Sequence, residues 1–204
     1  MIRNVYCVGR NYKLHAAELG NDVPDEPMIF LKPSHAVAAL DGQSLVLPRD
    51  KGEVHYEGEL VLRVKRAYEP GLRADELIGD MALGIDFTLR DVQTVIKKKG
   101  HPWTAAKGFK NAAPVSGFVD FPGVEGIGAQ DFTVHKNSSE VQRGNTKDMI
   151  FSIQEIVDYV GLNYGLGEGD VIFTGTPAGV GPCNAGDKFE LYWGEQLLGS
   201  CVID

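Results

Sequence analysis

The sequence has few cysteines, no long apolar stretch and no excess of basic residues. Its three cysteines, Cys7, Cys183 and Cys201, form no CxxC pair, which argues against a disulfide framework or a zinc knuckle and fits a reducing compartment. No apolar run approaches the roughly 18 residues of a membrane-spanning helix, and the N-terminus lacks the apolar core of a secretory signal. We therefore expect a soluble, cytoplasmic protein with no membrane partner.

A basic surface for nucleic acid is also missing. The 20 basic residues are outnumbered by 28 acidic ones, and the formal net charge is −8 at pH 7. The one positive run, Lys97 to Lys99, is typical of a helix end, where cations complement the helix dipole. The 204 residues, 43% of them hydrophobic, suffice for one well-filled core, and no Ser/Pro-rich linker divides them. We predict a single domain over residues 1–204 and no nucleic-acid partner.

Several common catalytic motifs are absent too. The glycine-rich loop over residues 175–181 has no Gly-Lys-Ser/Thr of a P-loop and no G-x-G-x-x-G, so it does not predict phosphate binding. No G-x-S-x-G supports Ser/His/Asp catalysis. Within the loop, the hydroxyl of Thr176 could still touch a ligand.

The sequence does contain a strand with an acidic face, over residues 54–64. Alternate side chains there are apolar, while His55, Glu57 and Glu59 point to the opposite face. Two neighbouring carboxylates repel each other and are costly to desolvate unless a cation or a proton compensates them. A solvated edge strand would tolerate them, but the strength of the apolar face favours part of a metal site.

A second strand, residues 83–90, has the same alternation. Its polar face carries Asp86, Thr88 and Arg90. Together the two strands offer three carboxylates: Glu57, Glu59 and Asp86. Hard oxygen ligands without a thiolate suit Mg²⁺, Mn²⁺ or Ca²⁺ rather than zinc. The residues therefore indicate a divalent-metal site, with exposed acidic strands that hold no metal as the alternative.

A short helix is predicted over residues 12–19, with Gly20 closing its C-terminal end. On this helix His15 and Glu18 are three residues apart and share a face. A carboxylate next to an imidazole raises the pKa of the histidine and orients it, as a general base requires. The alternative is a solvent-facing pair without function, and the spacing alone favours it.

The remaining pattern is rich in strands. Strands are expected near residues 2–8, 28–31, 42–48, 115–119, 132–136, 140–144, 171–174, 187–193 and 197–203. Lys32 ends one of them and either reaches the surface along its apolar stem or contacts a ligand carboxylate. Asp91 is expected to cap a helix to about residue 99, and Ser152 and Glu155 form a capping box. Strands outnumber helices without regular βαβ alternation, which predicts a β-dominated α+β fold.

Several segments run in a fixed order along nearly the whole chain. They are Gly9-Arg10-Asn11-Tyr12 with His15 and Glu18, Phe30-Leu31-Lys32-Pro33, His55-Tyr56-Glu57-Gly58-Glu59, Asp86-Phe87-Thr88-Leu89-Arg90-Asp91-Val92-Gln93, Lys97-Lys98-Lys99-Gly100, Pro102-Trp103, Ala106-Lys107, Met149-Ile150-Phe151-Ser152, and Thr174-Gly175-Thr176-Pro177 with Gly179-Val180-Gly181. Any one segment is weak evidence, but the ordered set is specific. On these segments the sequence resembles the fumarylacetoacetate hydrolase family, in particular its short single-domain members that act as acylpyruvate hydrolases or oxaloacetate decarboxylases.

The resemblance implies a layered roll of mixed β-sheets with a few peripheral helices, and a homodimer. It implies that the metal is held by Glu57, Glu59 and Asp86. It also implies that His15 and Glu18 form a base dyad on a lid, and that Lys107 contacts substrate oxygens near the metal. The substrate pocket would be completed by Arg10, Lys32, Arg90, Gln93 and Thr176. Long family members have a further acidic ligand ahead of the base histidine, but residues 7–10 contain no carboxylate. A three-carboxylate site is therefore expected.

The resemblance further implies an enzyme that depends on Mg²⁺, with Mn²⁺ or Ca²⁺ as other candidates, and acts on a small keto acid. We expect hydrolysis of a carbon–carbon bond in 2,4-dioxo acids (acylpyruvates), with His15 and Glu18 activating water and Lys107 stabilising the departing pyruvate enolate. Decarboxylation of oxaloacetate needs the same enolate stabilisation without the water. Two alternatives stay open: a decarboxylase/isomerase of aromatic catabolism in the same family, and a non-catalytic Ca²⁺-binding β-domain.

Overall fold

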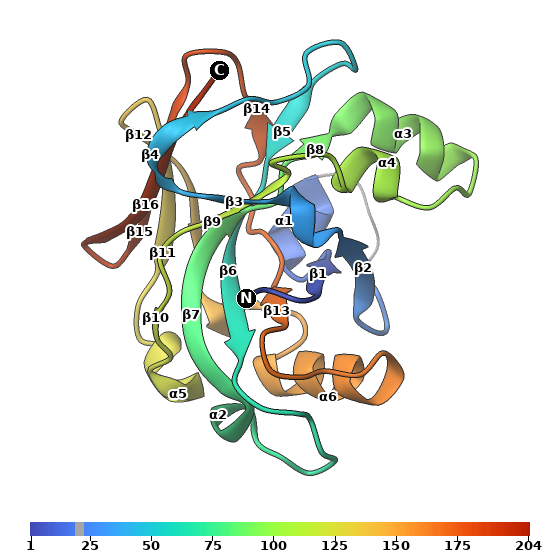
Figure 1. Cartoon of the computed structure of the whole chain (residues 1–204), viewed down its shortest axis with the longest axis vertical. Helices are drawn as coiled ribbons and strands as arrows, with labels where there is room; N and C mark the ends of the chain where they lie inside the picture. Colours follow the sequence, from blue (N-terminus) through green and yellow to red (C-terminus); the bar gives the residue numbers. More distant parts are fainter. Residues whose placement is uncertain (19–22) are drawn as a thin grey trace.

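Strands dominate the computed structural model, which describes residues 1–18 and 23–204. In these residues the strands form three sheets with eight, five and three members (Figure 1). The largest sheet is mixed, since β1 runs parallel to β13 and antiparallel to β2. Its strands, in order across the sheet and with β10 attached to β7, are β2 (Met28–Lys32), β1 (Val5–Gly9), β13 (Val171–Phe173), β6 (Gly58–Val64), β7 (Ile78–Ile85), β9 (Ala113–Val115), β3 (Val37–Ala39) and β10 (Val119–Asp120).

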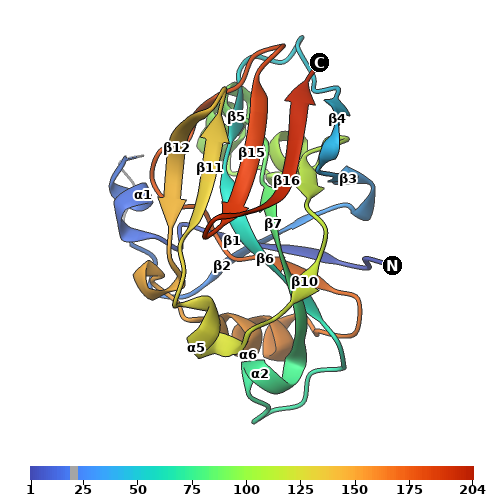
Figure 2. The same cartoon turned by 90° about the vertical axis from the view of Figure 1, so that its left-hand side faces the viewer.

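The five-stranded sheet faces the viewer in Figure 2 and packs against β6 and β7. Across the sheet its strands are β12 (Ser139–Gly144), β11 (Phe132–Lys136), β15 (Lys188–Trp193), β16 (Gln196–Ile203) and β4 (Asp41–Leu45). Leu60 and Leu62 from β6 share one buried core with Phe189 and Leu191 from β15. The layers meet closely, because a Cβ added to Gly58 would lie 2.2 Å from a methyl carbon of Val134. This arrangement confirms the predicted β-dominated, layered fold.

The third sheet and the helices lie around these two layers. The small sheet consists of β14 (Gly181–Pro182), β5 (Val54–Tyr56) and β8 (Thr88–Leu89). The helices are α1 (Lys13–Glu18), α2 (Ala74–Leu77), α3 (Arg90–Lys98), α4 (Thr104–Lys107), α5 (Gly123–Ile127) and α6 (Ile153–Asn163), with short 3₁₀ turns at Ser34–Ala36 and Thr146–Asp148. In Figure 1, α3 and α4 lie together at the upper right, and α2, α5 and α6 lie at the lower end. No helix in residues 1–18 and 23–204 is long and apolar enough to cross a membrane.

Helix α6 forms as its sequence predicts. Ser152 and Glu155 make the expected capping box: Ser152 Oγ accepts a hydrogen bond from Glu155 N at 3.3 Å, and Glu155 Oε2 accepts one from Ser152 N at 2.8 Å. Four apolar side chains at helical spacing then bury one face: Ile153, Ile156, Val157 and Val160.

The two acidic strands are shorter than predicted. The segment 54–64 is divided at Glu57 into β5 and β6, which belong to different sheets. The segment 83–90 breaks likewise, because β7 ends at Ile85 and the chain leaves its ladder. Asp86 N donates to the carbonyl of Glu57 at 2.7 Å, and Phe87 N donates to the carbonyl of Ala112 at 3.0 Å. Both breaks therefore fall at acidic residues of the predicted site.

Other predicted boundaries also need correction. Asp91 does not cap α3, since the helix begins at Arg90 and the Asp91 carboxylate instead accepts a hydrogen bond from Glu53 N at 2.9 Å. The strand expected near residues 115–119 is two short strands, β9 and β10. The predicted helix over residues 12–19 is observed as α1, and Gly20, its expected C-terminal residue, lies outside the described residues.

Candidate active site and metal centre

Two neighbouring strand ends bring the three acidic residues together. Glu57 lies in the break between β5 and β6, and Asp86 directly follows β7. Because β6 and β7 are antiparallel with Gly58 opposite Ile85, these two carboxylates come from facing positions. One oxygen from each of Glu57, Glu59 and Asp86 lies within 4.8 Å of the others. The three residues are 5%, 2% and 1% exposed, so they form a buried cluster and not the solvated edge that was the alternative.

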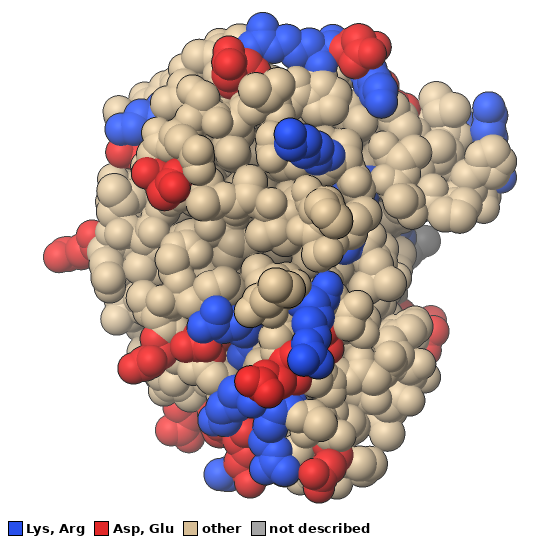
Figure 3. Space-filling view, viewed as in Figure 1, with Lys and Arg blue, Asp and Glu red and all other residues tan. Residues whose placement is uncertain are grey.

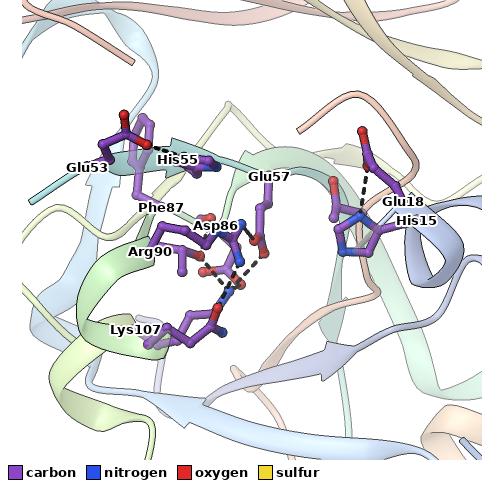
Figure 4. A network of polar contacts seen from close by, with 12 residues as sticks. His15, Glu18, Glu53, His55, Glu57, Asp86, Phe87, Arg90 and Lys107 are labelled. Atoms are coloured by element: carbon purple, nitrogen blue, oxygen red, sulfur yellow. Dashed lines mark hydrogen bonds and ion pairs between the residues drawn. The ribbon is translucent and has the colours of Figure 1, made fainter. Parts of the chain in front are cut away.

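Basic side chains from three different elements surround this acidic cluster. Lys107, the last residue of α4, places its ammonium 2.8 Å from Glu57 Oε2 and 2.5 Å from Asp86 Oδ2. Arg90, the first residue of α3, donates a short hydrogen bond to Glu57 Oε1. Figure 4 shows Lys107 and Arg90 converging on Glu57 and Asp86. From β2, Lys32 Nζ lies 2.7 Å from Asp86 Oδ1. The buried carboxylates of Glu57 and Asp86 are tolerated here because these three cations lie beside them.

The charges of this network determine its protonation. Burial alone would lower the pKa of Lys107, but Asp86 and Glu57 outweigh burial and raise that pKa above its ordinary value. Burial alone would raise the pKa of Glu57, but Lys107 and Arg90 outweigh it and hold that pKa well below its ordinary value. Lys107 also donates to Thr88 Oγ1 at 2.6 Å. The site therefore holds a fixed ammonium next to an ionised carboxylate.

Glu59 is the member of the cluster without a cation of its own. Among the described residues it forms no ion pair, and its Oε2 accepts a hydrogen bond from Gly175 N at 2.8 Å. Burial and the nearby Asp86 raise the pKa of Glu59 well above its ordinary value. Asp86 Oδ1, although close to Lys32, also lacks a hydrogen-bond partner in the described part of the chain. A hard divalent cation between these carboxylate oxygens would satisfy both groups, so the residues fit Mg²⁺ or Mn²⁺.

A cavity of about 290 Å³ opens onto the acidic cluster. It is lined by most of the predicted site residues: Arg10, His15, Glu57, Glu59, Asp86, Arg90, Gln93, Lys107 and Thr176. Glu18 and Lys32 are not part of this lining. Its size is at the lower end of ligand pockets and suits a small organic acid.

His15 and Glu18 form the pair that their spacing predicts. His15 Nδ1 lies 3.5 Å from Glu18 Oε2, and the imidazole is on the cavity side with the residue only 5% exposed (Figure 4). The expected rise in pKa is wrong: burial lowers the pKa of His15 and outweighs the opposing effects of Glu57 and Glu18. The histidine is therefore neutral near pH 7, which is the form that accepts a proton. Glu18 also accepts weak hydrogen bonds from Gly179 N, at 3.2 and 3.3 Å, and so connects α1 to the loop over residues 175–181.

Two residues that were predicted to contact the substrate, Lys32 and Thr176, form hydrogen bonds with other protein atoms. Lys32 is 2% exposed, and its ammonium donates to the carbonyls of Phe87, Lys107 and Ala112 in addition to pairing with Asp86. The Thr176 hydroxyl donates to the carbonyl of Gly58 at 2.8 Å and accepts from Gln142 Nε2 at 2.8 Å. These contacts orient the backbone around the acidic cluster, and a direct role in substrate binding stays a prediction for both residues.

The sequence analysis missed part of the cavity wall: Met28, Phe30, Thr94, Lys97, Lys98 and Trp103. Phe30 and Trp103 form an aromatic surface, with ring centroids 5.5 Å apart. Lys97 and Lys98 were interpreted as a helix end and as part of a family segment, but not as site residues. Their spacing from Arg90 on α3, seven and eight residues, would have placed them on the same helix face as this predicted site residue.

The chain is similar to known proteins along nearly its whole length. The family model described as fumarylacetoacetate (FAA) hydrolase C-terminal matches residues 4–202. The chain is 41% identical to the oxaloacetate tautomerase YcgM of Escherichia coli (strain K12), over 99% of this chain and 93% of that protein. It is 35% identical to a mitochondrial oxaloacetate decarboxylase of Dictyostelium discoideum, over 90% of this chain and 85% of that protein.

A solved structure extends the comparison to the fold. The fumarylpyruvate hydrolase of Pseudomonas aeruginosa, in complex with Mn²⁺ and pyruvate, matches with a TM-score of 0.90 and 33% identity over 99% of this chain and 89% of that one. These relatives are enzymes that act on small keto acids, as their names state. By the match of its sequence and its fold, this chain belongs to the fumarylacetoacetate hydrolase family.

Proposed function

We propose that this protein is a divalent-metal-dependent enzyme that interconverts the keto and enol forms of oxaloacetate or a closely similar 2-oxo acid. The observation that carries the proposal is the buried cluster of Glu57, Glu59 and Asp86, with the Lys107 ammonium beside it, at one end of a small cavity. The relatives named as oxaloacetate tautomerase and decarboxylase support the choice of substrate.

The chain's own groups suit this chemistry. A divalent cation held by Glu57, Glu59 and Asp86 would polarise the 2-oxo group and the adjacent carboxylate of the substrate. Lys107 keeps its proton, so its ammonium can stabilise negative charge that develops on the substrate oxygen. His15 lines the cavity in its neutral form and can take the proton from the carbon next to the keto group, then return it to the oxygen.

The pocket also selects an anionic substrate. Five basic side chains line the cavity, against three carboxylates: Arg10, Arg90, Lys97, Lys98 and Lys107. Arg90 Nη1 donates to Gln93 Oε1 at 2.8 Å, which fixes both side chains on the cavity face of α3. With a divalent cation added, the cavity carries an excess of positive charge that favours a dicarboxylate over a neutral carbonyl compound.

The test is an assay of oxaloacetate tautomerisation, followed by the ultraviolet absorbance of the enol, with added Mg²⁺ or Mn²⁺ and with EDTA. The metal-loaded chain should accelerate the loss of enol, and EDTA or Glu57→Gln should abolish the acceleration. The exposed variant Glu168→Gln is the matched control and should behave as the wild type. Absence of metal-dependent turnover of oxaloacetate in the wild type contradicts the proposal, and absence of turnover of acylpyruvates and dienoic acids as well would support the non-catalytic Ca²⁺-binding domain.

Hydrolysis of acylpyruvates is a second candidate, favoured by the contact between His15 and Glu18 and by the fumarylpyruvate hydrolase neighbour. In this reaction the pair would activate a water for attack on the distal carbonyl, whereas decarboxylation of oxaloacetate needs no attacking water. His15→Ala should therefore reduce hydrolysis of acetylpyruvate more than decarboxylation of oxaloacetate. Equal losses would contradict the role in water activation. Turnover of larger dienoic acids alone would instead support a decarboxylase/isomerase of aromatic catabolism.

We also propose a homodimer in which residues 1–204 act as one catalytic domain. The centre of the face shown in Figure 3 carries few charged side chains, although the chain has 20 basic and 28 acidic residues, and this distribution supports a contact with a second copy. Light scattering after size-exclusion chromatography measures the mass, and a monomer would contradict the proposal.

The three free thiols are consistent with the expected cytoplasmic location.

A further inference from the structure

A group of basic side chains lies at the outer end of the cavity. Lys97 and Lys98 line it and are exposed, and Arg10 lines it and is half-buried, whereas the acidic cluster is buried. The cavity therefore extends from the acidic cluster to these three residues, which we call the outer cationic group. Its members come from α3 and from the turn after β1.

Helix α3 sets the distance between the two ends of the cavity. Arg90, which contacts Glu57, and Lys97 are seven residues apart on one helix face, about 10 Å along the axis. Gln93 and Thr94 line the wall between them. The lysine side chains are long and flexible, so their ammonium groups can approach an anion at a range of depths in the cavity.

The outer cationic group has no counter-ion of its own in the part of the chain that the structure describes. Within residues 1–18 and 23–204, no carboxylate forms an ion pair with Arg10, Lys97 or Lys98. Burial lowers the pKa of Lys97, and the charges of Arg10 and Arg90 lower it further. Like charges that gather without a partner are a cost to the protein unless an anion binds among them.

Arg10 is held in place by a constrained turn. Its backbone is in the left-handed region with φ of 57°, which costs energy for a side chain of this size. The next residue, Asn11, is fully buried and anchors the turn: its Oδ1 accepts from Phe151 N at 2.8 Å, and its Nδ2 donates to the carbonyl of Thr174 at 2.9 Å. The anchored turn thus presents Arg10 to the cavity.

We propose that Arg10, Lys97 and Lys98 form a second anion subsite, which binds the distal carboxylate of a dicarboxylic substrate while its 2-oxo acid end lies at the acidic cluster. The proposal rests on the proposed function for the inner end of the cavity. It assigns the preference for dicarboxylic over monocarboxylic substrates to residues that take no part in the chemical step.

Binding of two inert ligands tests the subsite without turnover. Malate and lactate share a 2-hydroxy acid group and differ in the second carboxylate, so their dissociation constants for the Mn²⁺-loaded chain can be compared by calorimetry. The wild type should prefer malate, and Lys97→Met should weaken malate roughly fivefold, the effect of one solvent-screened charge pair, while leaving lactate unchanged. Lys99→Met is the matched control, because Lys99 is the next lysine of the run but does not line the cavity.

Steady-state kinetics gives a second readout. Lys97→Met and Arg10→Met should each raise KM for oxaloacetate with little change in kcat, and should leave KM for acetylpyruvate unchanged. Equal losses for dicarboxylic and monocarboxylic ligands, no loss at all, or the same loss in Lys99→Met would overturn the proposal. If the chain turns over none of these substrates but its preference for malate still falls in Lys97→Met, the subsite stands and the proposed function fails.

Discussion

Replacing Lys32 with Met distinguishes a structural counter-ion from a substrate contact. The side chain of Lys32 is fully buried, and its ammonium contacts Asp86 Oδ1 at 2.7 Å and the carbonyls of Lys107 and Ala112 at 2.5 and 2.8 Å. Methionine fills a similar volume but removes the ammonium from Asp86 Oδ1 and from the Lys107 carbonyl, while the Ala112 carbonyl keeps its hydrogen bond from Phe87 N. Removing one partner of a buried ion pair costs about 3–5 kcal/mol. For a chain of this length the melting temperature should then fall by on the order of 10 °C.

Adding Mn²⁺ gives the experiment a second readout, in which the variant should be stabilised more than the wild type. Without Lys32 the acidic cluster holds one more uncompensated negative charge, so Mn²⁺ should bind the variant more tightly than the wild type. The rise in melting temperature on adding Mn²⁺ should therefore be larger for Lys32→Met than for the wild type, as measured by calorimetry in EDTA and in excess Mn²⁺. Lys51→Met, at an exposed position, serves as the control. An unchanged melting temperature together with a raised KM would refute this reasoning and support the substrate contact that the sequence predicted.

Four further outcomes follow from single features of the structure. Ser152→Ala removes one half of the capping box of α6 and should cost about 1 kcal/mol, a fall of about 2–4 °C in melting temperature; an unchanged value would contradict the cap. Desolvation raises the pKa of the half-buried Cys183 and that of the buried Cys201 to about 12, so both thiols should react with a disulfide reagent at pH 8 more than about 100-fold slower in the folded chain than after unfolding; fast labelling of the folded chain would contradict the raised pKa values. The pKa of His15 lies below its ordinary value of 6.5. The rate should therefore stay constant from neutral pH down to pH 6.5, and should fall only at lower pH, where the imidazole becomes protonated. Because Glu18 raises the pKa of His15, Glu18→Gln should move the acid limb of the pH–rate profile to lower pH, and a shift to higher pH would contradict the pairing.

The acidic cluster could be predicted because its cause is local in the sequence. Glu57 and Glu59 are two apart on a segment whose other face is apolar, and a strand places such residues on one side. The approach of Asp86 required the pairing of β6 with β7, which the apolar alternation of both segments suggests but does not fix. His15 and Glu18 were likewise a local pair, since three residues in a helix bring two side chains together.

The remaining contacts of the site depend on tertiary structure. The role of Lys32 depends on β2, β8 and β9 meeting at one point, where its ammonium contacts the carbonyls of Phe87 and Ala112. The pKa of His15 is lowered by the burial of its side chain beside the cavity. The spacing of residues along the sequence does not predict this burial. The breaks at Glu57 and Asp86 were missed because each extended segment reads as one strand until its hydrogen-bond partners are known.

The balance of charge in the site links metal binding to substrate binding. Among the described residues, Lys32, Lys107 and Arg90 pair with Asp86 and Glu57, so Glu59 leaves at most one negative charge of the cluster for a metal to neutralise. A divalent cation at this site would therefore add charge that the protein does not compensate, in a cavity whose outer end carries Arg10, Lys97 and Lys98 as well. A dianionic substrate supplies the missing negative charge. Each ligand should then increase the affinity for the other by the same factor, because coupling between two binding sites is reciprocal.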